Sequence, residues 1–218
     1  MLKTLISRFT ERRALNAYTV GDYAKAEQLF SALRAREGET QRVLRNLGLI
    51  RMAQGDLAAA EAYFAREVEA FGPAPDRLQA LADVAYLSGD RVKARQRLQE
   101  ALADPGCTAR ELFQQRADIC ADAAAHARAM RGKQEFAQAN ALLAAKEVDK
   151  ALALFRRALA ADPTDFIALN NIGGILLNQK DDPAGAAKAF SQALAMQKLP
   201  VLKINLDRAK ARLKEKAS

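Results

Sequence analysis

The stretch GDYAKAEQLF, residues 21–30, decides the fold because it returns at a fixed interval. Related segments, GDLAAAEAYF at 55–64 and GDRVKARQRL at 89–98, follow at steps of 34 residues. A repeat of this length indicates a helical solenoid in which each unit is a pair of helices. One pair cannot bury its apolar face alone, so neighbouring pairs must stack and create an extended concave surface. Binding is therefore the first hypothesis for function.

Small and large residues occupy fixed columns of the repeat. The first helix of successive units carries a small residue that lets its paired helix approach: Ala14, Gly48, Ala82, Ala139 and Gly173. The second helix carries an alanine and, four positions later, a bulky apolar residue: Ala26 and Phe30, Ala60 and Phe64, Ala94 and Leu98, Ala151 and Phe155, Ala186 and Phe190. Burying each large side chain is worth roughly 1.5–3 kcal/mol, whereas a helix of this length is marginal alone. Stacking should therefore hold the fold together.

These columns resemble the tetratricopeptide repeat, a family of 34-residue helix-turn-helix units, over most of the chain. The best single match runs from Ala139 through Phe155 to Ala161-Asp162-Pro163, where the closing proline of the family pattern is present. The first three units close instead with a glycine, which can end a helix in the left-handed conformation. These glycines are Gly38, Gly72 and Gly106.

The chain departs from the family pattern at Arg13 and Gln138, where a large apolar residue is usual, and at Glu67, where alanine is usual. The resemblance implies an all-α, right-handed superhelix with a C-terminal capping helix. It also implies a protein-interaction scaffold that is not an enzyme and needs no cofactor. Composition agrees with an all-α chain, because half the residues are hydrophobic, only 6% are aromatic, and period-2 runs of β-branched residues are rare.

We expect two blocks of repeats. The predicted segments are an N-terminal block over 1–108 with units at 7–40, 41–74 and 75–108, a linking helix at 109–131, a second block over 132–200, and a basic capping helix at 201–218. The linking stretch lacks the Gly-Asp turn, and its only breaker before Lys146 is Gly132. One long or kinked helix over 109–145 is the preferred interpretation. The alternative is a separate helix that ends near Gly132.

The residues that usually carry chemistry are sparse. His126 lies six positions after Cys120 in a presumed helix, which turns the two side chains about 120° apart, so they form no catalytic pair. Cys107 and Cys120 lack metal-ligand spacing, which indicates reduced thiols and no metal site. Gly173-Gly174 lies in a helical pattern, so close packing explains it better than a nucleotide. We predict no catalytic residue.

The sequence also indicates a cytoplasmic protein. No apolar run approaches the ~18 residues that would span a bilayer, and the apolar opening lacks a signal-peptide cleavage site. Leu2, Leu5, Ile6 and Phe9 nevertheless recur at helical spacing among basic residues. This stripe could dock on an anionic membrane or a partner helix. The favoured interpretation is that it covers the end of the first repeat, so a membrane partner is not expected.

The net charge of +8 is uneven, because residues 201–218 carry six cations and two acids. A possible basic surface for phosphates of nucleic acid or for acidic partners comprises Lys203, Arg208, Lys210, Arg212 and Lys214. The favoured alternative is a solubilising outer face on the capping helix. No aromatic residue interleaves these cations, and base-stacking sites usually need one.

Partner contacts should come from the inner face of each unit's first helix. In the first block this face is an apolar floor with a basic rim, and its predicted groove residues are Leu15, Tyr18, Arg42, Arg45, Asn46, Leu49, Met52 and Tyr86. Such a surface suits a peptide or amphipathic helix with apolar anchors and some acidic residues. The alternative for Leu15 and Leu49 is packing between units.

The resemblance also suggests and excludes specific contacts. Relatives that bind the carboxylate end of chaperones use a lysine, two asparagines and further cations on this face, and in the first three units only Asn46 matches. We therefore predict no such clamp. In the second block Asn140 and Asn171 fall where family members hydrogen-bond an extended peptide backbone, with Phe136 and Asn170 beside them. The alternative is an ordinary helix surface.

Two hypotheses for function follow. The favoured one is a non-catalytic adaptor that captures a protein segment in its groove, within a larger assembly such as a secretion, pilus or envelope complex. The other is a nucleic-acid-associated factor that uses the basic C-terminal helix. A homo-oligomer formed through an uncapped repeat end is compatible with either.

Overall fold

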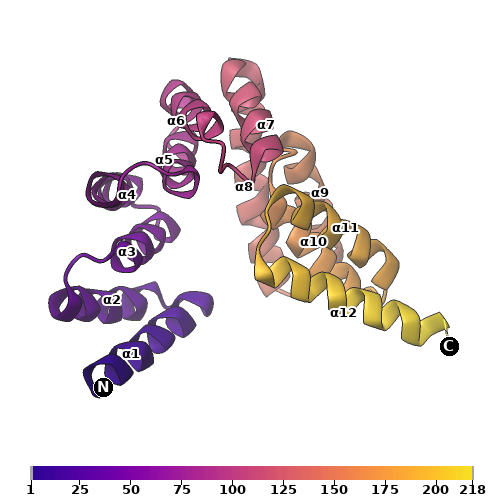
Figure 1. Ribbon diagram of the computed structural model, residues 1–218. Helices are drawn as coiled ribbons and strands as arrows, with labels where there is room; N and C mark the ends of the chain where they lie inside the picture. The colour runs from indigo at the N-terminus through magenta and orange to yellow at the C-terminus, as the bar shows by residue number, and fades with distance from the viewer. Residues whose placement is uncertain (1, 218) are drawn as a thin grey trace. The chain divides into compact units, whose positions relative to one another are not determined.

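A computed structural model describes residues 2–217, with side chains described for 5–216. Within that range the secondary structure consists of twelve α-helices and short connections, without a strand (Figure 1). The chain divides into two compact units at Gly106 and Cys107, close to the predicted end of the first block at residue 108. The all-α helical-repeat fold predicted from the sequence is confirmed.

The first unit is three consecutive helix pairs. Its helices are α1 (Leu2–Thr19), α2 (Tyr23–Glu37), α3 (Gln41–Ala53), α4 (Leu57–Phe71), α5 (Pro75–Leu87) and α6 (Arg91–Ala103). Each helix packs against the next one along the chain. The second helices of these pairs each bury their column residue completely, since Phe30, Phe64 and Leu98 are all 0% exposed.

The recurring Gly-Asp phrase has a local physical cause. Gly21, Gly55 and Gly89 have φ between 82° and 87°, a left-handed conformation that L residues with side chains avoid. The aspartate that follows accepts a hydrogen bond from a backbone N–H of the next helix, as Asp22 does from Lys25 at 3.2 Å. The glycine thus ends the first helix of each pair, and the aspartate begins the second.

The second unit also stacks helix pairs. It comprises α7 (Arg110–Ala121), α8 (Ala123–Ala144), α9 (Val148–Ala161), α10 (Phe166–Asn178), α11 (Pro183–Met196) and α12 (Pro200–Ala217). Its small-against-large column is tight at Gly173, where an added Cβ would lie 2.7 Å from Cε1 of Phe190. The capping helix α12 covers α11 with Leu202, Leu206 and Ala209, all of which are buried.

The single helix expected over 109–145 is wrong. The chain breaks at Asp122, whose backbone is extended and whose side chain accepts hydrogen bonds from the N–H groups of Ala124 and Ala125. An aspartate that can cap a new helix in this way ends the preceding one without glycine or proline. Gly132 does not end a helix, since it lies within α8. A Cβ added at Gly132 would lie 2.9 Å from the Cβ of Ala161. Close approach of α9 therefore explains this glycine.

A buried polar network ties α7 and α8 to the turn before α10. Asp162, Thr164 and Asp165 are at most 4% exposed. The Nζ of Lys133 lies 2.7 Å from Oδ2 of Asp165 and 3.5 Å from Oδ2 of Asp162, and Nε of Arg116 donates to Oγ1 of Thr164 at 3.3 Å. Burial alone would raise the pKa of Asp162, but Lys133, the Thr164 hydroxyl and Arg116 outweigh it and lower that pKa.

The lowered pKa of Asp162 makes stability depend on pH. The ionised carboxylate stabilises the folded state fully above its pKa in the unfolded chain, about 3.9, and this contribution is lost as pH falls through the lower folded pKa. We expect urea midpoints, followed by circular dichroism, to fall between pH 5 and pH 3 less steeply in Asp162→Asn than in the wild type. Asp118→Asn, on the exposed side of α7, should keep the wild-type slope. If the urea midpoint fell equally steeply with pH in all three proteins, the ionised Asp162 would not be the stabilising group.

Candidate functional site

The predicted groove of the first unit contains less free charge than the sequence suggests. Nη1 of Arg42 lies 2.7 Å from Glu11 and its Nη2 lies 2.8 Å from Glu37. Arg45 contacts Glu67 and Asp76. The basic rim expected from these two arginines is therefore neutralised by acids of neighbouring helices.

Apolar and polar groove residues of the first unit divide between surface and core. Leu15 is 41% exposed, while Tyr18 is half-buried with its ring centroid 5.6 Å from that of Tyr23. Leu49 and Met52 are partly buried against the cluster formed by α4 and α5. The Nδ2 of Asn46 donates to the backbone oxygen of Arg42 at 2.8 Å, so this amide is engaged within its own helix.

The groove role predicted for Tyr86 is wrong, because its side chain is only 2% exposed. The physical reason lies in α5, which packs against both α4 and α6 and buries more than half of its residues. A tyrosine near the end of such a helix contributes to packing, and a bulky amphipathic ring does so as readily as it lines a groove. Helical spacing alone predicts Tyr86 on the inner face, whereas packing of α5 buries its side chain.

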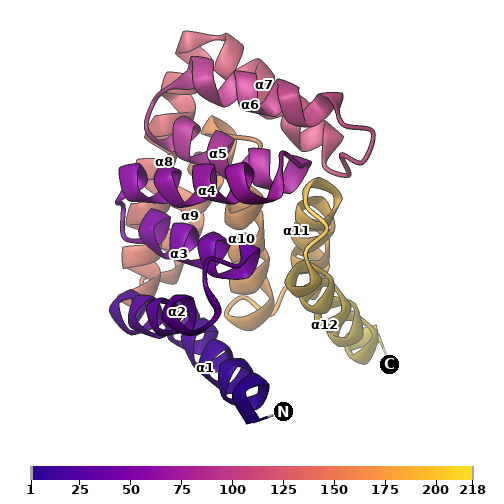
Figure 2. The ribbon, with the colours of Figure 1, turned by 60° about the vertical axis from the view of Figure 1, so that its left-hand side comes forward.

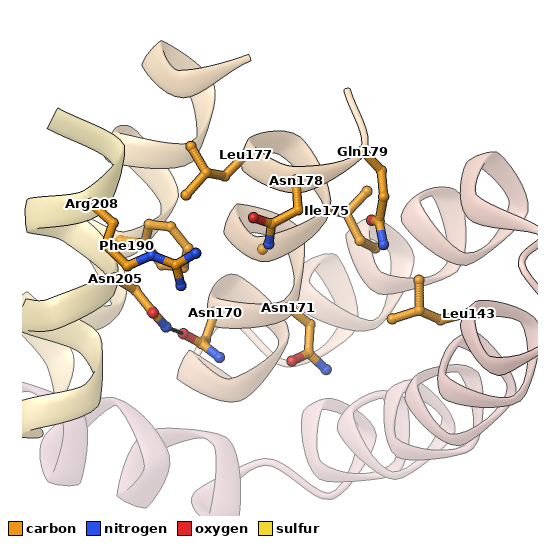
Figure 3. A pocket seen from close by; sticks show the side chains of 11 residues that line it. Leu143, Asn170, Asn171, Ile175, Leu177, Asn178, Gln179, Phe190, Asn205 and Arg208 are labelled. Carbon is orange, nitrogen blue, oxygen red and sulfur yellow. Dashed lines mark hydrogen bonds between the residues drawn. The ribbon is translucent and has the colours of Figure 1, made fainter. Parts of the chain in front are cut away.

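Amide side chains gather on one face of the second unit. Asn171 of α10 donates to Oδ1 of Asn140 of α8 at 3.4 Å, and Asn205 of α12 donates to Oδ1 of Asn170 at 2.9 Å. The resulting row crosses three helices, α8, α10 and α12. Figure 3 shows its members Asn170, Asn171 and Asn205. Sequence reasoning identified Asn140, Asn170 and Asn171 and missed Asn205, although it follows Asn170 by 35 residues, close to one repeat length.

Asn170, Asn171 and Asn205 border a hollow of about 240 Å³ between α10 and α12. Its apolar part is made by Leu143, Ile175, Leu177 and Phe190, and its polar part by Asn170, Asn171, Asn178, Gln179, Asn205 and Arg208 (Figure 3). A second hollow of about 400 Å³ shares Leu177, Asn178 and Arg208 with the first and extends to Arg212 and Glu215. We call the two together the amide groove.

Phe136 does not belong to the amide groove. Its ring meets that of Phe155 edge to face, with centroids 5.3 Å apart and an interplanar angle of 70°. It is half-buried against the cluster of Ala139, Ala151 and Phe155. Its contribution is therefore to the core of the second unit.

The predicted basic surface of α12 is split between two sides of the helix. At about 100° per residue, Lys203, Lys210 and Lys214 share one side, while Arg208 and Arg212 lie well over 100° away. Arg208 and Arg212 border the amide groove. Lys203 lies 3.2 Å from Asp207, and Arg212 lies 3.5 Å from Glu215. The five cations therefore do not share one side of α12.

Arg208 carries a charge that is unmatched, unlike that of Arg212, which also borders the amide groove. In the part of the chain that the structure describes, its guanidinium forms no ion pair. It lies at the junction of the two hollows, beside Asn205 (Figure 3). An exposed guanidinium with free donors can hold a carboxylate with two parallel hydrogen bonds.

The described residues offer no metal site and no membrane-spanning helix. Side chains of His, Cys, Asp and Glu in residues 5–216 form no group of three that could hold a metal ion. His126, Cys107 and Cys120 are buried, and both cysteines are free thiols. Within residues 2–217, every helix is too short or too polar to cross a membrane.

A family model described as "Tetratricopeptide repeat" matches residues 12–75 and 136–200, more than half of the sequence. The chain belongs to the tetratricopeptide repeat family. The first match covers helices of the first unit. The second runs from within α8 to the end of α11 and includes most of the amide groove. The predicted unit at 75–108 lies outside both matches.

Several solved structures are similar to this chain. The Cut9–Hcn1 hetero-tetramer of the APC/C is matched at 14% identity and a TM-score of 0.50, over 93% of this chain and 42% of that one. MamA from Desulfovibrio magneticus is matched at 14% identity and 0.47, over 88% and 95%. YrrB, titled a TPR protein with an unusual peptide-binding site, is matched at 15% identity and 0.44, over 91% and 90%. A search of curated protein sequences finds no match.

Family membership and fold together support a protein-interaction scaffold. Tetratricopeptide repeat proteins are generally non-catalytic and present a concave face to a partner. Family membership does not identify the binding residues or the partner segment, which must be inferred from the geometry of this chain.

Proposed function

We propose that this protein is a non-catalytic adaptor whose amide groove holds an extended segment of a partner protein. The observation that carries the proposal is the row Asn140, Asn171, Asn170 and Asn205 across three helices. Each amide offers an N–H donor and a C=O acceptor, the two groups that an extended backbone presents in return. Such a row can bind the backbone of a peptide with little dependence on the peptide's sequence.

The preference for particular segments comes from charge. Arg208 stands at the end of the amide row with free donors, and Arg212 adds positive charge beside it. Glu215 lies close to Arg212 and partly neutralises it, so Arg208 is the stronger attraction. The preferred segment therefore carries a carboxylate at the position that reaches Arg208, with small apolar side chains for the hollow near Leu177.

The test is selection from a display library of random peptides on the immobilised full chain, with counter-selection on Asn171→Ala, Asn205→Ala. Peptides with a recurring acidic position should emerge. The dissociation constant of a fluorescent copy, measured by anisotropy, should rise about tenfold or more in the double variant, because two hydrogen bonds of about 0.5–1.5 kcal/mol each are lost. Arg208→Gln should weaken the binding of acidic peptides. It should leave unchanged the binding of analogues in which the acidic side chain is replaced by its amide.

Gln138→Ala provides the matched control. Gln138 is an exposed amide of α8 that lies two residues from Asn140, hence about 200° around the helix. Its removal should leave peptide affinity unchanged. The proposal fails if the library yields no binder, or if Gln138→Ala costs as much affinity as the groove variant while circular dichroism shows both proteins folded.

A further inference from the structure

The N-terminal helix exposes apolar side chains that the rest of the first unit does not cover. Leu5 is 63% exposed, Ile6 45% and Phe9 64%. Nine residues separate Leu5 from the buried Ala14, which places them about 180° apart on α1. The prediction that this stripe covers the end of the first repeat is therefore wrong for these three residues; the side chain of Leu2 lies outside those described. In Figure 2 the N-terminal end of α1 extends away from α2.

Arginines flank the exposed stripe. Arg8, Arg12 and Arg13 are all exposed, and the guanidinium carbon of Arg13 lies 5.8 Å from the centroid of the Phe9 ring. The one acid of α1 is Glu11, whose carboxylate contacts Arg42 on α3. The outward face of α1 is thus apolar and cationic without a compensating carboxylate of its own.

We propose that this face of α1 docks on an anionic lipid surface, with the helix lying in the plane of the interface. Phe9 and Leu5 would enter the boundary between headgroups and acyl chains, and the arginines would contact lipid phosphates. Long arginine side chains can keep their charge at headgroup level while their methylene groups cover apolar neighbours. The proposal is independent of the amide groove, which lies in the other unit.

Two other occupants fit the same face less well. A second copy of the chain, related by a two-fold axis, would place Arg8, Arg12 and Arg13 opposite their own counterparts, and like charges would repel. A peptide partner needs a groove for its anchoring side chains, whereas the outward face of a single helix is convex. A planar anionic surface attracts the positive charge of α1 and can accept its convex face without a groove.

The experiment is flotation of the full chain with vesicles of phosphatidylcholine alone or mixed equally with phosphatidylserine. The wild type should bind the mixed vesicles and not the neutral ones, and added salt should weaken binding through screening. Phe9→Gln, Arg12→Gln should reduce the apparent affinity about tenfold or more, since one apolar contact and one lipid-facing charge are lost. Both side chains are exposed, so the variant should keep the wild-type circular dichroism spectrum.

Val92→Gln, Arg95→Gln on α6 is the matched control, because it removes an exposed apolar side chain and an exposed arginine from another helix. It should bind vesicles like the wild type. The proposal is overturned if the wild type ignores phosphatidylserine, or if this control loses as much binding. It is also overturned if sedimentation without lipid shows a dimer that the α1 variant cannot form, because a second copy would then cover the face.

Discussion

Replacing Phe155 by alanine should lower the free energy of unfolding by about 3–5 kcal/mol. Phe155 is 0% exposed in α9, and its ring meets Phe136 of α8 edge to face. The cluster that surrounds it joins α8, α9 and α10 through Ala139, Ala151 and Ile172. Removing the ring leaves a cavity in this close-packed cluster, which the surrounding side chains can fill only in part. Urea denaturation followed by circular dichroism would measure the loss.

Phe71→Ala is the matched control for that measurement. Phe71 is the last residue of α4 and is 41% exposed, so removing its ring should cost well under half as much. Comparable losses for the two substitutions would show that the column of large residues does not hold the stacked helices together. A loss at Phe155 alone would support stacking of small on large as the source of stability.

The column residues could be predicted from the sequence because they depend only on distance along the chain. Gly173 and Phe190 meet because a repeat fixes both positions, and the structure places them in contact. The same holds for Gly48 and Phe64. Periodicity reports which residues recur, and recurring residues are the ones that pack between helices.

Features that occur once in the chain could not be predicted in this way. The helix break at Asp122 depends on one side chain that caps α8, and Asp122 looks no different in sequence from an aspartate within a helix. Tyr86 shares the spacing of a groove residue but lies in a helix buried on most of its surface. Asn205 and Arg208 reach the amide groove because α12 packs beside it, which the cationic composition of that helix obscured.

The distribution of charge argues for separate roles of the two units. In the first unit Arg42 and Arg45 are matched by acids, so a partner would have to displace existing ion pairs. In the second unit Arg208 is unmatched and the neighbouring amides are within reach of a ligand. Desolvating a paired charge costs free energy that an unpaired surface arginine does not require. We therefore expect an extended acidic segment to bind in the amide groove in preference to the first unit.

An ion pair between Arg45 and Glu67 stands where the family pattern usually has alanine. Removing Arg45 should cost much more stability than removing Glu67. Glu67 is 0% exposed, and Nε of Arg45 lies 3.1 Å from its Oε1 and 3.0 Å from its Oε2. Oε2 accepts no hydrogen bond among the described residues, so it depends on the charge of Arg45. Arg45→Met should cost about 3–5 kcal/mol, because it leaves a buried carboxylate without its cation.

Glu67→Ala should cost much less than Arg45→Met, since Arg45 is partly exposed and keeps its contact with Asp76, 2.7 Å away. The double variant Arg45→Met, Glu67→Ala should then be more stable than Arg45→Met alone, because it no longer buries an unpaired charge. Urea midpoints of the four proteins complete the double-mutant cycle. If the two single losses simply add, Glu67 is not held by Arg45, and the buried carboxylate must be stabilised by another group. If the double variant recovers stability, this ion pair is replaceable.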